Sequence, residues 1–314
     1  MSGAVPQGVA GFVRLALSLA FILAVPPLMD GYSRRLKAAM QYRVGPPLLQ
    51  TWYDLTSLFR MGSNAPTKAL SFTLAPCVAL ASAVLAATLL PYGQLPPITF
   101  SWDVFVLIYC LSMVSVSMIL AGFSVRNPYA NIGANREMML VLTGEPVLGV
   151  VLAVLALNSS SLSTLGITHY LRLRPSLLLI LPILLYVAYV ESAFIPLDIA
   201  EAETEILEGP LVEYGGVLLG LFKYSLMIKR FALLWLASSV LIFPLYGLLG
   251  SVGPALASDL LTFAAQFLTY FTLHTLYTVV EASNARWKVR DAMKLNVKVF
   301  VAGILILILT ATGW

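Results

Sequence analysis

The densest group of ionisable side chains in this sequence lies between residues 191 and 216. Seven of the 15 acidic residues fall there, with no Lys or Arg among them: Glu191, Asp198, Glu201, Glu203, Glu205, Glu208 and Glu213. Crowded like charges disfavour full ionisation, so these carboxyl groups either pair with cations from elsewhere or share protons near neutral pH. The second case is the chemistry of a proton relay.

Other ionisable residues lie inside long apolar runs. Glu145 occurs in LTGEPVLG, and Lys223, Lys229 and Arg230 occur in the run that follows the acidic segment. Ionisable groups inside a membrane are costly, and function is their default interpretation. We expect Glu145 and Lys223 to join the relay. For Lys229 and Arg230, extension to the headgroup boundary stays open as an alternative, and for Glu145 a structural ion pair with one of these cations stays open.

The composition requires a membrane protein. Of the 314 residues, 59% are hydrophobic and 11% are charged, and the mean hydropathy is +0.88. An apolar run of about 20 residues matches the hydrocarbon thickness of a bilayer. Eight such runs occur, at residues 9–29, 70–91, 103–123, 138–157, 176–195, 217–247, 260–281 and 297–313. The predicted fold is all-α: one polytopic membrane domain of eight spans over residues 1–314, without a soluble domain.

The basic residues predict the orientation of these spans. Lys and Arg concentrate in the connections at 30–69, 124–137 and 282–296, whereas the connections at 92–102 and 248–258 have none. Only the connection at 158–175 breaks this alternation, with Arg172 and Arg174. The positive-inside rule then places the basic connections and the acidic loop at 196–216 in the cytoplasm, and both termini outside. The net charge of +4 reflects this orientation and gives no reason to expect nucleic-acid binding.

A short amphipathic helix is predicted within the first basic connection. Gly45, Pro46 and Pro47 end the preceding helix, and Leu48, Trp52, Leu55 and Phe59 then recur on one face over residues 48–61. Such a helix can lie in the interface plane of the membrane. Two functions stay open for it: a connector that lies on the lipid surface, and the lining of a docking site for a soluble partner.

The sequence argues against a metal site on this chain. Cys77 and Cys110 lie alone inside apolar runs, and His169 and His274 are far apart. No pattern of Cys or His resembles iron–sulfur or haem ligation. We therefore expect no metal ligand here.

Three motifs resemble one known family. They are RxxxAxxQxRxGPPxxQ from Arg34 to Gln50, AGFS…ANIGANREM from Ala121 to Met138, and ESxxxPxDxxEAExEILEGPxxEYGG from Glu191 to Gly216. In this order and between these spans, they resemble the family of the complex I H subunit, the eight-helix membrane subunit at the joint between the redox arm and the ion-pumping arm. The resemblance covers nearly the whole chain.

The resemblance implies roles for particular residues. Glu145 matches the family's buried glutamate, and the acidic segment matches a loop that feeds a chain of carboxylates leading to antiporter-like subunits. The docking platform for hydrogenase-like large and small redox subunits would include Arg34, Arg35, Arg43, Trp52, Asp54, Arg126 and Arg136. Small membrane subunits and the lipid bilayer are further expected partners. The chain alone is not expected to be catalytic.

Two departures from the quinone-reducing members point to a subgroup. First, Pro46 is followed directly by Pro47, Leu48, Leu49 and Gln50, without the Gly-containing insertion that those members usually have before this Gln. Second, Phe194 stands where those members carry Arg. Both features resemble membrane-bound [NiFe]-hydrogenases and sulfur-reducing relatives of the cell membrane. Iron–sulfur clusters and a NiFe centre would then lie in partner subunits, and a bound quinone is put in doubt. The alternatives are a quinone-binding H subunit, a passive membrane anchor and a stand-alone transporter.

Overall fold

The computed structural model describes residues 7–63, 66–67, 69–200, 206–250 and 255–313, and this part of the chain is helical without a β-strand. The long helices are α1 (Gln7–Met40), α3 (Leu70–Thr88), α4 (Asp103–Phe123), α5 (Pro128–Ser159), α7 (Pro175–Glu191), α9 (Gly216–Leu241), α11 (Ala255–Ser283) and α12 (Val289–Ala311). The short elements are α2 (Gln50–Arg60), α6 (Thr164–Tyr170), α10 (Phe243–Gly250) and the 3₁₀ turn η1 (Gly209–Leu211). An all-α fold is confirmed.

Each of the eight predicted spans coincides with one of the long helices. Five of these are long and apolar enough to cross a membrane: α1, α3, α4, α5 and α12. Helix α7 is a shorter apolar helix of 17 residues. The chain is therefore a polytopic membrane protein, while the count of eight crossings stays a prediction.

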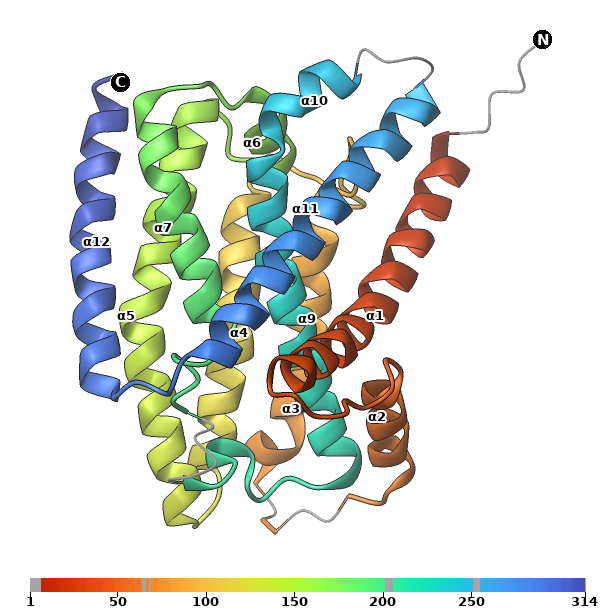
Figure 1. Ribbon diagram of the computed structural model, residues 1–314, viewed down its shortest axis with the longest axis vertical. Coiled ribbons are helices and arrows are strands. Elements are labelled where there is room, and N and C mark those ends of the chain that lie inside the picture. Colours follow the sequence, from red (N-terminus) through yellow and green to blue (C-terminus); the bar gives the residue numbers. More distant parts are fainter. Residues whose placement is uncertain (1–6, 64–65, 68, 201–205, 251–254, 314) are drawn as a thin grey trace.

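The long helices form a bundle with two distinct ends (Figure 1). Helix α5 packs against α12, α4 and α7, while α3 packs against α4 and α9. Helices α1 and α11 cross the face beside α9. One end carries α2, η1 and the acidic segment, and the opposite end carries α6, α10, the start of α1 and the end of α12. The described loop and turn of the acidic segment therefore lie at the end of the bundle opposite the start of α1 and the end of α12.

Three details differ from the sequence-based expectations. Helix α1 continues to Met40, eleven residues beyond the predicted span, so Arg34, Arg35 and Lys37 of the first basic connection lie on this helix. The predicted run at 217–247 is two helices, because Pro244 cannot donate the hydrogen bond that would continue α9 beyond Leu241. Helix α6 was not predicted; the Ser163 hydroxyl caps its start by accepting a hydrogen bond from the Gly166 N–H at 3.0 Å.

Two tyrosines satisfy backbone carbonyls that prolines leave open inside helices. Pro27 lacks an N–H, which frees the Leu23 carbonyl of α1, and the Tyr224 hydroxyl of α9 donates to that carbonyl at 2.7 Å. Pro76 likewise frees the Phe72 carbonyl of α3, and the Tyr214 hydroxyl donates to it at 2.9 Å. These bonds tie α1 to α9 and tie the end of the acidic segment to α3.

The amphipathic helix predicted at 48–61 is α2, which is confirmed within two residues at its start. Leu55 is buried and Trp52 is half-buried, with its ring 6.5 Å from that of Tyr224. The Phe59 ring lies against Gly220 of α9, where a Cβ would be 3.1 Å away. The apolar face of α2 therefore packs on α9, and its other face stays exposed.

Candidate functional site: an acidic cavity between α4, α5, α7 and α9

A buried ion pair lies at the centre of the bundle. The Lys229 Nζ of α9 is 2.9 Å from a carboxylate oxygen of Glu191, the last residue of α7, and 2.8 Å from the Ser115 hydroxyl of α4. The two charged side chains are only 6% and 7% exposed. Such a pair forms only where the opposite charge and further hydrogen bonds compensate for lost hydration. The two groups therefore belong to one electrostatic unit.

Two further carboxyl groups, both on α5, interact with this ion pair. Glu137 and Glu145 are eight residues apart, which places them on one face of a helix about 12 Å apart. Both interact electrostatically with Glu191 and Lys229. One oxygen of Glu145 is buried without a hydrogen-bond partner among the described residues. Between the two acids, Gly144 leaves the space for Glu191, since a Cβ there would lie 2.8 Å from its carboxylate.

The pair opens on a polar cavity of about 120 Å³. Its ionisable lining residues are Glu137, Glu191, Asp198, Lys229, Arg230 and Glu281. Four carboxyl groups and two cations therefore line one cavity. Because a change of charge on one member alters the proton affinity of the others, the cavity can hold and pass protons as a coupled set.

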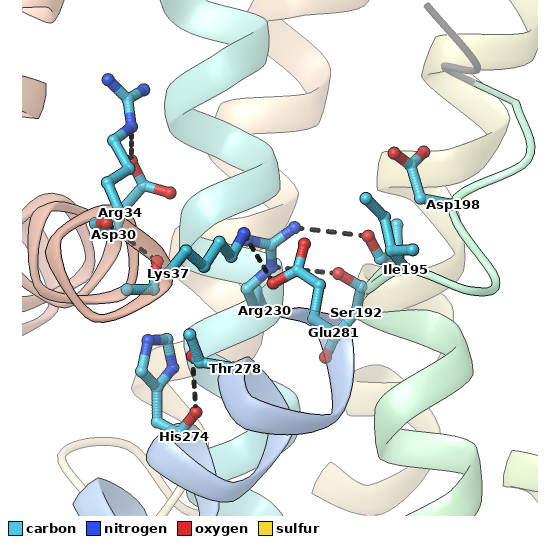
Figure 2. Close-up of polar contacts among 12 residues, drawn as sticks. Asp30, Arg34, Lys37, Ser192, Ile195, Asp198, Arg230, His274, Thr278 and Glu281 are labelled. Atoms are coloured by element: carbon cyan, nitrogen blue, oxygen red, sulfur yellow. Dashed lines mark hydrogen bonds and ion pairs between the residues drawn. The ribbon is translucent and has the colours of Figure 1, made fainter. Parts of the chain in front are cut away.

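The loop after α7 forms one wall of this cavity, and cations hold it there. The Arg230 Nε donates to the Ser192 carbonyl at 3.0 Å, and the guanidinium carbon lies 4.4 Å from the centre of the Phe194 ring. Figure 2 shows Arg230 of α9 directed at this loop, with Glu281 of α11 beside it and Lys37 of α1 on the side away from the loop. Lys37 and Glu281 are an ion pair at 2.6 Å. Three helices and the loop therefore meet at Arg230.

Asp198 is the member of the acidic segment that reaches the cavity from the loop. It pairs with Arg286 of the connection between α11 and α12 at 3.0 Å. Burial raises the pKa of Asp198 above its ordinary value, while the Arg286 charge and hydrogen bond act in the opposite direction. The loop acid is therefore more easily protonated than an exposed aspartate.

Replacing Arg286 with glutamine should raise the pKa of Asp198 further, because burial then acts without the paired cation. The carboxylic-acid band of Asp198 in pH-titrated infrared difference spectra of the complex should persist to higher pH. Asp198→Asn identifies the band, since the variant must lack it. An unchanged titration in R286Q would show that the ion pair does not control this carboxyl group.

Among the described relay residues, Glu145, Glu208, Glu213 and Lys223 are not part of the cavity lining. Glu208 pairs with Lys223 at 3.2 Å in a half-exposed contact, and Glu213 accepts a hydrogen bond at 2.5 Å from Asn127 next to the start of α5. Glu201, Glu203 and Glu205 lie outside the described residues. The structure thus brings together Glu145, Glu191 and Asp198 from the predicted set, and it places Lys223 with Glu208 at the surface.

Four ionisable cavity residues were not part of the predicted relay: Glu137, Lys229, Arg230 and Glu281. Glu137 lies within the motif ANIGANREM but was not singled out, although its spacing of eight residues from Glu145 was a usable signal. Glu281 comes from a predicted span end, where an acid more often marks the interface. For Lys229, extension of the side chain to the headgroup boundary was left open as an alternative, whereas the residue is only 4% exposed and points inward.

The predicted docking residues occupy the end of the bundle that carries the acidic segment. Arg35, Arg43 and Arg126 are exposed there, and Arg136 is half-buried. Arg34 instead bonds within the chain, to Asp30 at 3.0 Å and to Asp54 of α2 at 2.8 Å. Arg34 and Asp54 therefore orient α2 on α1, and the exposed arginines remain for a partner.

Comparison with known proteins then decides the family, since the sequence profile of the NADH dehydrogenase family matches residues 13–312. The chain belongs to this family. Its relatives include hydrogenase-4 component C of Escherichia coli (strain K12), 36% identical over 69% of this chain and 71% of the relative. Formate hydrogenlyase subunit 4 of the same organism is 31% identical over 70% and 74%. The H subunit of the NADH-quinone oxidoreductase of Thermomicrobium roseum is 32% identical over 68% and 70%.

A solved structure agrees with the fold of this NADH dehydrogenase family member. A chain of the membrane-bound sulfane sulfur reductase, an archaeal respiratory membrane complex, superposes with a TM-score of 0.80 at 22% identity. The match covers 96% of this chain and 99% of the other. The resemblance to the complex I H subunit stated from the motifs is confirmed, and so is homology to membrane components of complex I-like respiratory systems.

Proposed function

We propose that this chain is the membrane subunit on which the redox arm of a complex I-like respiratory complex docks, and that it couples electron transfer to ion translocation. The observation that carries the proposal is the buried Lys229–Glu191 pair, set among further carboxylates in a cavity of the bundle. A passive anchor has no use for such a costly arrangement. Multisubunit relatives, hydrogenase-4 and formate hydrogenlyase among them, support the existence of partner subunits.

The proposed coupling starts at the loop wall of the cavity. Electron transfer in a docked partner changes the charge or position of the loop that carries Asp198. That change alters the proton affinity of Glu191 and Glu137 through their shared electrostatic interaction with Lys229. Glu145, eight residues further along α5, then passes the disturbance into the membrane. Antiporter-like and small membrane subunits are the proposed recipients.

For the terminal acceptor we propose protons or a sulfur compound, reduced in partner subunits whose iron–sulfur and NiFe centres carry the electrons. Phe194 is fully buried among aromatic rings beneath Arg230, so an apolar ring fills the place where quinone-reducing members carry Arg. The acidic cavity, at about 120 Å³, is also smaller than the roughly 300–1,000 Å³ of small-molecule sites. Both features support an acceptor that is reduced outside this chain.

A quinone-reducing complex is the second candidate, because several relatives are named as H subunits of NADH-quinone oxidoreductases. Purification of the tagged chain with its partners from cell membranes, in mild detergent, separates the two. Nickel and iron without quinone are the expected result. Iron with bound quinone and without nickel would favour the second candidate, and iron with neither would indicate a sulfur-reducing complex. Crosslinking in intact membranes controls for partners lost to detergent.

We also propose an orientation in the cell membrane. Both ends of the chain lie on the outer side, and α2 and the acidic segment lie on the cytoplasmic side. Arg35, Arg43 and Arg126 are exposed at the end of the bundle that carries α2, which supports this orientation by the positive-inside rule. The proposed redox subunits would dock on the same end.

A further inference from the structure

A second, much smaller cavity lies between α1, α9 and α11. Its volume is about 10 Å³, close to the lower limit for one enclosed water molecule. Asp30 of α1, Arg230 of α9 and His274 of α11 line it, together with the phenol of Tyr270 of α11. Figure 2 shows Asp30 and His274 on the side of Arg230 that faces away from the loop. Arg230 lines both cavities, so it forms the wall between this space and the acidic cavity.

His274, which lines this cavity, has one unused hydrogen-bonding atom. The residue is 3% exposed, and its Nε2 lies 3.1 Å from the Met29 carbonyl of α1. A carbonyl only accepts, so Nε2 must carry the hydrogen, and Nδ1 of the neutral ring is then an acceptor. That buried Nδ1 has no hydrogen-bond partner among the described residues. A buried acceptor of this kind requires a donor, since an unmade hydrogen bond is costly in a dry environment.

Asp30 and Arg230 supply the remaining contacts that a water molecule needs. One carboxylate oxygen of Asp30 accepts from the Thr51 hydroxyl at 2.8 Å and from the Arg34 Nε at 3.0 Å, so the charge of Asp30 is held in place. Arg230 directs Nε at the Ser192 carbonyl and presents five N–H donors in all. A water that donates to His274 Nδ1 and to Asp30 and accepts from Arg230 makes three hydrogen bonds, the usual number for buried water.

We propose that one ordered water molecule occupies this cavity and completes a hydrogen-bonded connection from α2 to the acidic cavity. The connection runs from Asp54 of α2 through Arg34 to Asp30, then through the water to Arg230. A displacement of α2 by a docked partner is thereby transmitted to the residue that holds the loop after α7. The water site rests on the cavity and on His274, Asp30 and Arg230, whereas its role in coupling rests on the proposed function.

The experiment is a high-resolution electron cryo-microscopy map of the intact complex, compared with those of two variants. The unchanged complex should show density for one water within hydrogen-bond distance of His274 Nδ1, Asp30 and Arg230. His274→Phe keeps an aromatic ring next to Phe194 and Tyr270 but removes the acceptor, so the density should disappear. His274→Gln offers an amide oxygen, so the density should be retained. An empty cavity in the unchanged complex, or a direct protein contact to Nδ1, overturns the site.

Ion uptake into reconstituted vesicles tests the role of the water in coupling. With acceptor reduction driven equally in all samples, His274→Phe should slow uptake by about twofold to thirtyfold, the range for substitutions along a coupled network, and His274→Gln should restore it. Equal uptake in the Phe variant despite loss of the water overturns the role in coupling. Failure of the proposed function is distinguishable from both outcomes, because an unchanged complex that translocates no ions would contradict it whatever occupies the cavity.

Discussion

Replacing Lys229 with methionine should destabilise the complex strongly and abolish ion translocation, whereas the double substitution K229M/E191Q should recover assembly without translocation. In the single variant the Glu191 carboxylate stays buried, at 7% exposure, without its cation. Breaking a buried pair by removing one partner costs about 3–5 kcal/mol, while neutralising both partners costs far less. The double variant keeps a polar amide at position 191 but has no charge to exchange. Thermal unfolding of the purified complex and ion uptake into vesicles are the two measurements.

Lys223 provides the matched control for this experiment. It lies six residues earlier in the same helix and pairs with Glu208, but those side chains are 38% and 45% exposed. An exposed pair contributes about 0–1 kcal/mol, so K223M should unfold nearly as the unchanged complex does. Equal damage from K223M and K229M would show that burial does not set the effect. Full ion uptake by K229M/E191Q would refute a role for the pair in translocation.

Replacing Arg230 with glutamine should release the loop after α7 and uncouple ion translocation from electron transfer. Arg230 donates to the Ser192 carbonyl and reaches the Ala193 carbonyl at 3.5 Å, while its guanidinium covers the Phe194 ring. Ala193 has a positive φ of 50°, a conformation that disfavours an L-residue and persists only when surrounding contacts hold it. Loss of a charge-assisted bond of about 2–3 kcal/mol should speed amide hydrogen exchange at residues 193–200 by about 30- to 150-fold.

Two further variants define what that result means. Arg230→Lys keeps the charge but loses the planar group that covers Phe194, so exchange should rise by less than in R230Q. Arg126→Gln removes an exposed arginine at the same end of the bundle and should leave exchange at residues 193–200 unchanged. Electron transfer should continue in R230Q while ion uptake falls. Unaltered exchange in R230Q would mean that other contacts hold the loop.

The sequence was sufficient to predict the long helices but not α6, α10 or the way in which the helices pack. Apolar length alone located all eight long helices, because the bilayer imposes that length whatever the neighbours are. Contacts between helices could not be predicted in this way. Lys229 and Glu191 are 38 residues apart, and no periodic pattern along one helix indicates which neighbouring helix its charged face contacts. Their pairing depends on how α7, α9 and α4 pack together.

The acidic segment also shows that the sequence did not predict which ionisable residues lie together. Its carboxylates were expected to act together because they are close in sequence, yet Glu208 and Glu213 make separate contacts with Lys223 and Asn127. The acids that do share the cavity, Glu137 and Glu281 among them, come from helices far apart in the chain. Closeness in sequence was therefore a weaker guide than position along the face of a helix.

The hydroxyl groups of Tyr214 and Tyr224 have a consequence for biosynthesis. They satisfy the carbonyls of Phe72 and Leu23, which belong to helices made well over a hundred residues earlier. An open carbonyl in hydrocarbon costs several kcal/mol. We therefore expect these two carbonyls of α3 and α1 to reach their native hydrogen-bond partners only after the start of α9 has been synthesised. The hydrogen bonding of α1 and α3 thus depends on residues from the middle of the chain, which are synthesised later.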